Sequence, residues 1–432
     1  MARLSRCILL LANVLCLRSA RTAENWMGKH WEAIKERTIL QLTLPGSHNS
    51  GNSASLSDNN PCRSDYKFYR MYIDSLPPAH PALDEKSFNA LFLPWNINHN
   101  HTIVEQLQLG TRYFHLKLCN FNSPGNKSMD PGNVFHEHRG YTSPISLASI
   151  LSVMRSFLTS HPHEVIALGF NNLANSASSR FSVTDVEALA LAVRDEFAKD
   201  ELLLLDHDDL QMSLEDIIAR RKRVAAFFPF ASSATSIGLR SSEVLSEHWS
   251  DHMESGNLLR GEQWLVQDLK AAATQRGRFY VMQANPNNAV PEMIKLIQSG
   301  GPPFSLRLWI EPFLRNLSRL VFEAVAEDSR IRINAISTDF LDISRPYDIA
   351  MQLMGLPDDP EHLPELDLAV VWKVFACIFG VFVLGLLVLL CCRRKKRVEA
   401  ASNAAPRMHD AGISLIRLFG MARGQREWHA LA

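Results

Sequence analysis

The sequence predicts an α/β fold, either an α/β barrel or a doubly wound sheet, followed by one transmembrane helix. Strand-like and helix-like stretches alternate from about residue 30 to residue 356, as in folds whose parallel sheet is covered by helices. Ionisable side chains stand where several of the predicted strands end. One uninterrupted apolar run, residues 374–392, comes after the alternating region.

Short runs rich in β-branched and aromatic residues mark the predicted strands, and helical periodicity separates several of them, as at residues 146–160 and 183–197. An eighth strand is expected in the irregular region 231–262. The seven clear strands are residues 39–44, 112–118, 134–138, 165–170, 224–228, 279–283 and 333–338.

The two ends of the chain carry targeting signals. Arg3 and Arg6 precede a short apolar run and then small residues, so residues 1–23 are predicted to be a signal peptide, with an uncleaved anchor as the alternative. The run at 374–392 is long enough to cross ~30 Å of hydrocarbon as a helix. Five basic residues, 393–397, follow it and should remain cytosolic.

This topology predicts a single-pass type I membrane protein. Residues 28–356 would form an extracellular or lumenal domain, 357–373 an acidic stem and 393–432 a cytosolic basic tail. In such a compartment Cys62 and Cys119 could form a disulfide. Sequons permit glycosylation of the external part, and they lie at Asn100, Asn126 and Asn316. Cysteines 391 and 392 are candidates for acylation.

The net charge of the chain argues against one class of partner, nucleic acid. Lys+Arg and Asp+Glu number 45 each, so the chain as a whole offers no electrostatic argument for binding nucleic acid.

The chemistry-bearing residues gather at the predicted strand ends. One histidine among 16 is a weak signal, but ionisable groups at four strand ends are a stronger one. Two histidines would serve as base and acid, a cation would hold an anion, and a carboxylate would orient a histidine. In chain order the residues are His48, His115 with Lys117, His136 and His138 followed by Arg139, and Asp339.

Several of these segments resemble motifs of the phosphatidylinositol-specific phospholipase C (PI-PLC) superfamily, especially its X-domain-only and bacterial-like members. The segments are residues 44–51, 109–118, His138 with Gly140, 156–168 and 334–340. The likeness covers about residues 28–350. It implies a distorted TIM (β/α)8 barrel and a phosphoric diester hydrolase or lyase that cleaves phosphatidylinositol-type lipids through a cyclic inositol phosphate.

The resemblance also implies roles for individual residues. His48 would be the general base that deprotonates the inositol 2-hydroxyl, and His138 the general acid for the leaving diacylglycerol oxygen. Asp339 would fix the tautomer of His48. Strand alternation places His136 on the same face as His138, so periodicity leaves both open as the acid. The spacing to Gly140 favours His138.

The chain departs from the family at the second motif. His115 and Lys117 occupy positions where bacterial-type members carry an aspartate and an arginine, and calcium-dependent members two acidic residues. Lys117 would neutralise the phosphate in place of arginine or calcium. Asn49 resembles the first calcium ligand, but the acidic partners are missing, so chemistry without a metal or other cofactor is expected and calcium is disfavoured. Asn49, His115 and Arg139 are predicted to contact substrate.

Three functions remain open at this stage. The first is a membrane-anchored phosphodiesterase whose substrate is phosphatidylinositol or a glycosylphosphatidylinositol (GPI) anchor in the leaflet that faces the barrel. The second is a catalytically weakened barrel that binds inositol lipid or glycan. The third is an adhesion or receptor ectodomain on a reused fold.

Overall fold

A computed structural model describes most of the chain between residues 23 and 357. The predicted signal peptide up to residue 22, the span at 374–392 and the tail lie outside the described residues, as do Cys62 and Arg139. No described helix is both long and apolar enough to span a bilayer. The described ranges are 23–53, 56, 68–76, 82–121, 129–138, 141–175, 180–229, 237–248, 258–275, 277–286, 290–299 and 305–357.

The described strands form one mostly parallel sheet. Its main path runs in the order β6, β7, β5, β2, β1, β11, β10, β9, and every neighbouring pair on this path is parallel. The strands are β1 (Leu44–Ser47), β2 (Tyr113–Asn120), β3 (Val134–His138), β4 (Tyr141–Ser146), β5 (Ile166–Asn175), β6 (Leu203–Leu204), β7 (Lys222–Phe228), β8 (Leu239–Arg240), β9 (Leu245–Glu247), β10 (Phe279–Gln283) and β11 (Ala335–Thr338).

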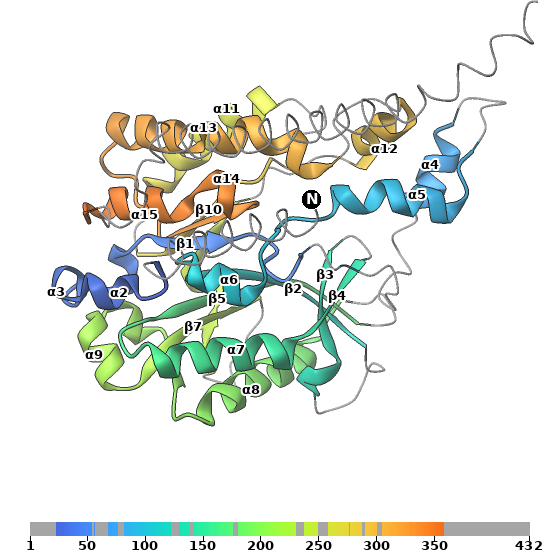
Figure 1. Ribbon diagram of the computed structural model, residues 1–432. Coiled ribbons are helices and arrows are strands. Elements are labelled where there is room, and N and C mark those ends of the chain that lie inside the picture. The colour runs from blue at the N-terminus through green and yellow to red at the C-terminus, as the bar shows by residue number, and fades with distance from the viewer. Residues whose placement is uncertain are drawn as a thin grey trace, which may run out of the picture. The chain divides into compact units, whose positions relative to one another are not determined.

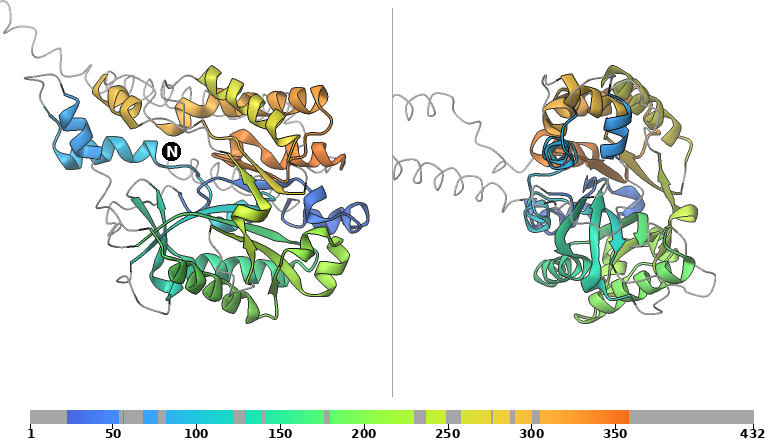
Figure 2. Two further views of the ribbon diagram at one scale, coloured as in Figure 1. Left: turned by 180° about the vertical axis from the view of Figure 1, so that it is seen from behind. Right: turned by 90° about the vertical axis from the view of Figure 1, so that its right-hand side faces the viewer.

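Helices lie around the strands, with α7 and α8 below them and α11 and α13 above them in Figure 1, and Figure 2 shows the same arrangement from behind. The longer helices begin where the sequence supplies a cap: Ser146 and Ser182 each accept a backbone N–H of the first turn. The α-helices are α2 (Trp26–Lys29), α3 (Trp31–Ile34), α4 (Phe68–Asp74), α5 (Glu85–Phe92), α6 (Ile103–Gln108), α7 (Leu147–Ser160), α8 (Val183–Ala198), α9 (Leu214–Ala219), α10 (Ser241–Val244), α11 (Leu258–Ala272), α12 (Val290–Ser299), α13 (Leu306–Glu327), α14 (Leu341–Ser344) and α15 (Pro346–Met354). The described residues also form four 3-10 helices: η1 (Ile39–Gln41), η3 (Leu93–Trp95), η4 (Pro131–Asn133) and η5 (Asp208–Gln211).

One of the predicted strands needs correction. Residues 39–41 form η1, because Thr38 and Gln41 make a reciprocal capping box, and β1 begins only at Leu44. The predicted strand at 134–138 is confirmed as β3, which is antiparallel to both β2 and β4. The two-residue connection from β3 to β4 is typical of a hairpin. The prediction of a further strand within 231–262 is confirmed, because β8 and β9 both lie there.

A buried ion pair fixes α2 near the N-terminal ends of β2 and β5. Arg112 Nε donates to Glu164 Oε2 at 2.6 Å, and neither side chain is exposed to solvent. The other carboxylate oxygen accepts the backbone N–H groups of Met27 and Gly28 in α2. Because both carboxylate oxygens are hydrogen-bonded, the buried charges are compensated.

Cys119 in β2 is disulfide-bonded, and its expected partner, Cys62, lies outside the described residues.

Candidate active site

Strand register brings the predicted base and its carboxylate together. Ser47 of β1 is the Cα partner of Thr338 of β11, so the next residues, His48 and Asp339, leave neighbouring parallel strands at the same level. The Nδ1 atom of His48 lies 2.9 Å from Oδ1 of Asp339, and both side chains are buried. A carboxylate in this position holds the proton on Nδ1 and stabilises the imidazolium.

A residue in the left-handed conformation follows each strand, two positions beyond its end. Asn49, directly after His48, has φ 49°, and Phe340, directly after Asp339, has φ 46°. A bulky residue such as Phe340 is rarely found in this conformation, which is costly unless the surroundings impose it. Such conformations cluster at functional sites, and here they flank the two members of the His–Asp pair.

His115 packs directly on His48. The pairing of Ser47 with Phe114 places these two histidines next to each other across β1 and β2, and their rings stack with centroids 5.1 Å apart. The Nδ1 atom of His115 accepts the backbone N–H of Asn49. Burial, and then the nearby His48, lower the pKa of His115 well below its usual value. His115 is therefore a neutral ring with its proton on Nε2.

Lys117 brings positive charge to the same strand end. Two residues beyond His115 on β2, it is half-buried and pairs in register with Asn171 of β5. Its charge contributes to the lowered pKa of both His115 and His136. This electrostatic effect places the ammonium group close to both histidines.

His136 is buried beneath the loop that follows β1. A Cβ atom on Gly51 would lie 2.6 Å from Cβ of His136, so only glycine permits this approach. Burial, followed by the charge of Lys117, lowers the pKa of His136 to about 3. This ring is consequently neutral at ordinary pH.

His138, at the end of β3, contacts two asparagines. Its Nδ1 atom lies 2.9 Å from Nδ2 of Asn52 and 3.2 Å from the carbonyl oxygen of Asn96. The antiparallel register pairs His136 with Leu118; continued by two residues, it brings His138 level with Leu116, between His115 and Lys117. The antiparallel β3 thus brings His138 next to the carboxyl end of the parallel strand β2.

Sequence reasoning missed a layer of polar residues beside the histidines, residues 96–99. Asn98 Oδ1 accepts Nδ2 of Asn49 at 3.2 Å and Nδ2 of Asn52 at 2.5 Å. His99 Nε2 donates to the carbonyl oxygen of His48 at 2.6 Å. Burial lowers the pKa of His99, so this donor is neutral. The signal available was the polar run itself, which follows the apolar η3.

A second missed group lies at the ends of β9 and β10. Glu247 accepts Nε2 of Gln283 and, at 3.4 Å, Nδ2 of Asn171. Its charge adds to burial in raising the pKa of Tyr113 well above the usual value. Glu247 falls in the irregular region of the sequence, where no strand boundary was visible.

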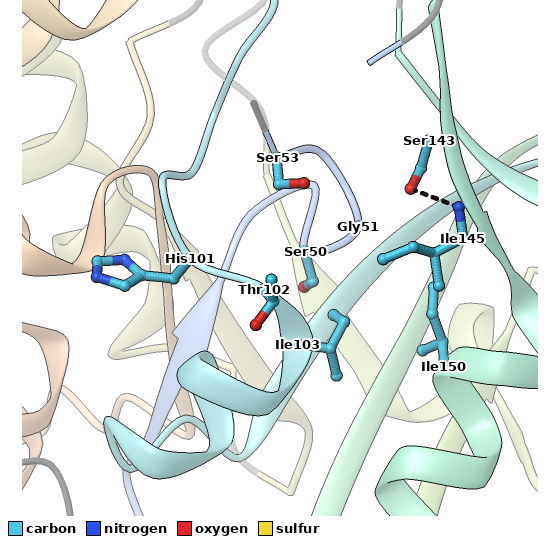
Figure 3. Close-up of a pocket in the computed structure, with 9 residues that line it drawn as sticks. All are labelled: Ser50, Gly51, Ser53, His101, Thr102, Ile103, Ser143, Ile145 and Ile150. Atoms are coloured by element: carbon cyan, nitrogen blue, oxygen red, sulfur yellow. Dashed lines mark hydrogen bonds between the residues drawn. The ribbon is translucent and has the colours of Figure 1, made fainter. Parts of the chain in front are cut away.

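A small hollow lies beside the loop after β1 (Figure 3). Its volume of about 10 Å³ is room for about one water molecule, so it is no substrate pocket. The residues that line it include Ser50, Gly51, His101 and Ser143, but neither His48 nor His138.

The structure thus brings together most of the predicted site. His48, Asp339, His115 and Asn49 are in contact, and Lys117 lies near His115. Arg139 lies outside the described residues. Within the described ranges no group of three or more His, Cys, Asp or Glu side chains could hold a metal ion, and the expectation of metal-independent chemistry stays a prediction.

Comparison with curated proteins gives relatives that are named as PI-PLC X domain-containing proteins. No protein-family model matches the chain. It is 30% identical over 156 residues to the human PI-PLC X domain-containing protein 2, covering 34% of this chain and 43% of that protein. The zebrafish (Danio rerio) PI-PLC X domain-containing protein 3 is 22% identical over 349 residues, which cover 78% of this chain and 95% of that protein. The match covers only 16% of a PI-PLC X-box domain-containing protein of Dictyostelium discoideum.

Among solved structures, the chain is similar to a phosphatidylinositol-specific phospholipase C from Staphylococcus aureus that carries pentafluoro-Phe. The TM-score is 0.50 at 12% identity, over 77% of this chain and 98% of that chain. This likeness concerns the fold alone. Together with the sequence relatives, it confirms the resemblance that the motifs predicted.

Proposed function

We propose, from the likeness of this chain to PI-PLC X-domain proteins, that it cleaves phosphatidylinositol-type lipids by histidine acid–base catalysis. The observation that carries the proposal is the buried His48–Asp339 pair, with its 2.9 Å bond, at the carboxyl ends of neighbouring parallel strands. Active sites of barrel enzymes lie at this end of the sheet.

The reaction begins with proton transfer to His48. The imidazole takes the proton of the inositol 2-hydroxyl, and that oxygen attacks phosphorus within the same molecule at little entropic cost. The bond from phosphorus to the glycerol oxygen breaks, His138 protonates this oxygen, and diacylglycerol leaves. The product is a cyclic inositol phosphate. Asp339 stabilises the imidazolium formed on His48.

The choice of His138 as the acid is supported by the state of its competitor. A pKa of about 3 keeps the His136 ring neutral. At neutral pH this ring therefore lacks the second proton that a general acid donates. His138 instead meets a backbone carbonyl that can accept its Nδ1 proton.

Lys117 supplies the positive charge for the phosphate. Its influence on the pKa of His115 and His136 supports a place beside the reacting group, where a cation stabilises the developing charge. A lysine lacks the bidentate fork of an arginine, so the rate is expected to be modest.

Topology points to the substrate. The signal peptide and the span predicted from the sequence place the barrel outside the cytosol, at most about 50 Å from its own bilayer along the stem at 3.3–3.6 Å per residue. We therefore favour a GPI anchor or outer-leaflet phosphatidylinositol over a polyphosphorylated inositide.

The experiment measures release of water-soluble inositol phosphate from phosphatidylinositol by the full-length protein in detergent micelles. His48→Ala, in a protein that unfolds at the temperature of the parent, should lose activity by about 10²–10⁴-fold. A second arm expresses the protein with a GPI-linked reporter on the same cell. Equal reporter release by parent and His48→Ala would argue against the anchor as substrate.

A second function is favoured by one feature. Histidine and lysine stand at 115 and 117, where the resemblance leads one to expect an acidic residue with an arginine or two acidic residues. A weakened barrel that binds inositol lipid without turnover would fit this pair. Retention on phosphatidylinositol vesicles with no inositol phosphate released would replace the enzymatic proposal with this one.

A further inference from the structure

The amide of Asn52 stands at the centre of the contacts around His138. Its Nδ2 atom lies 2.5 Å from the carbonyl oxygen of Asn96, 2.5 Å from Oδ1 of Asn98 and 2.9 Å from Nδ1 of His138. Asn52 and Asn98 are both buried. Three neighbours therefore compete for the two protons that an amide nitrogen carries.

A backbone atom fixes which way the amide points. If the Asn52 side chain were turned over, its oxygen would face the carbonyl oxygen of Asn96 at 2.5 Å, and two acceptors would repel each other. Side-chain amides can turn, but a backbone carbonyl cannot. The nitrogen of Asn52 must consequently face Asn96, and one of its protons is used there.

The second proton goes to the nearer acceptor. Asn98 Oδ1 lies closer to Asn52 Nδ2 than His138 Nδ1 does, by 2.5 Å against 2.9 Å. His138 Nδ1 also lies 3.2 Å from the carbonyl oxygen of Asn96. That contact is favourable only if Nδ1 is protonated and donates.

We propose that Asn52 and Asn98 are positioning residues that keep a proton on Nδ1 of His138, which donates it to the Asn96 carbonyl. The proton that His138 exchanges is then carried by Nε2. The tautomer is a property of the folded protein. Only its catalytic consequence rests on the proposed function, in which His138 gives the Nε2 proton to the leaving glycerol oxygen.

The same layer also holds the base. His99 donates to the carbonyl oxygen of His48, and its backbone N–H bonds the carbonyl oxygen of Asn52 at 3.1 Å. The N–H of Phe340, next to Asp339, bonds the carbonyl oxygen of Asn98 at 2.9 Å. Residues 96–99 thus join the loops after β1 and β11 to the end of β3, and hold acid and base in one frame.

The test is the ring nitrogen spectrum of His138. The full-length protein is labelled with ring-¹⁵N histidine in detergent micelles, and His138 is assigned by the loss of its signal in His138→Gln. The parent should show a protonated Nδ1 and an unprotonated Nε2 in the neutral ring. In Asn98→Ala the second proton of Asn52 has lost its oxygen acceptor, so it should turn to Nδ1 and shift His138 to the Nε2–H tautomer.

A double variant makes the test specific. Asn52→Leu removes both amide protons, so the combination of Asn52→Leu with Asn98→Ala should return His138 to the Nδ1–H form. Asn133→Ala, an exposed asparagine just before β3, is the matched control and should leave the spectrum as in the parent. If Asn98→Ala does not fold, Asn98→Ser serves in its place, with the same shift expected.

A kinetic arm addresses the catalytic consequence. Asn98→Ala should lower kcat about tenfold, since the Asn52 proton that turns to Nδ1 of His138 opposes the bond from a protonated Nδ1 to the Asn96 carbonyl. A parent protein with the Nε2–H tautomer, or an Asn98→Ala variant with the parent tautomer, would overturn the inference. A protein with the expected tautomers but no turnover would refute the proposed function and leave the positioning role intact.

Discussion

Replacing Asp339 by asparagine tests the centre of the proposed mechanism. The substitution keeps the size of the side chain and removes its charge. In the parent, Oδ1 of Asp339 lies 2.9 Å from Nδ1 of His48, and the two side chains are only 3% and 7% exposed. Solvent therefore screens the pair little.

The size of the effect follows from that contact. A hydrogen bond to a charged group contributes about 1.5–3 kcal/mol, and each 1.36 kcal/mol is tenfold in rate. Since the imidazolium forms only as the substrate reacts, the loss should appear in kcat. We expect kcat of Asp339→Asn to fall by roughly 10- to 150-fold.

The assay is release of inositol phosphate from phosphatidylinositol micelles, with thermal unfolding measured in parallel. Asp342→Asn is the matched control, because Asp342 pairs with Arg307 at the partly exposed surface and not with a histidine of the site. The control should keep the parent rate. A folded Asp339→Asn protein whose kcat falls by less than about threefold would refute the role given to this carboxylate.

Three further outcomes are expected. His138→Ala should lose activity by about 10²–10⁴-fold while His136→Ala loses much less; the reverse order in the micelle assay would make His136 the acid. Excess EGTA should not abolish turnover, and Lys117→Met should be severely impaired whereas Lys117→Arg retains activity; strict calcium dependence would contradict this. Because the folded pKa of His136 is about 3 against about 6.5 unfolded, only the unfolded chain takes up this proton between those values. Stability should therefore fall as pH drops from about 6.5 towards 3, and His136→Gln should have a shallower decline in melting temperature. An equal decline in parent and variant would count against the lowered pKa.

The residues of the His–Asp pair could be predicted from the sequence because their placement is local. His48 and Asp339 each follow directly after a buried strand, and parallel strands present such residues at one edge. Hydrophobic periodicity found most of the strands in the same way, and it located β8 and β9 to the right region. It misread residues 39–41, where a side-chain cap outweighed β propensity.

The sequence by itself determined which chemical groups stand at the strand ends, since a strand boundary and its next residue are read from a few neighbouring letters. Only the tertiary structure shows the surroundings of the two candidate acids, because alternation gives His136 and His138 the same face, while burial and the charge of Lys117 lower the pKa of His136 through space. Only the tertiary structure showed that residues 96–99 join the loops after β1 and β11 to the end of β3. Their bonds to Asn52 and His138 join positions more than 40 residues apart, and the path of the loop that makes such contacts depends on packing that no local pattern encodes.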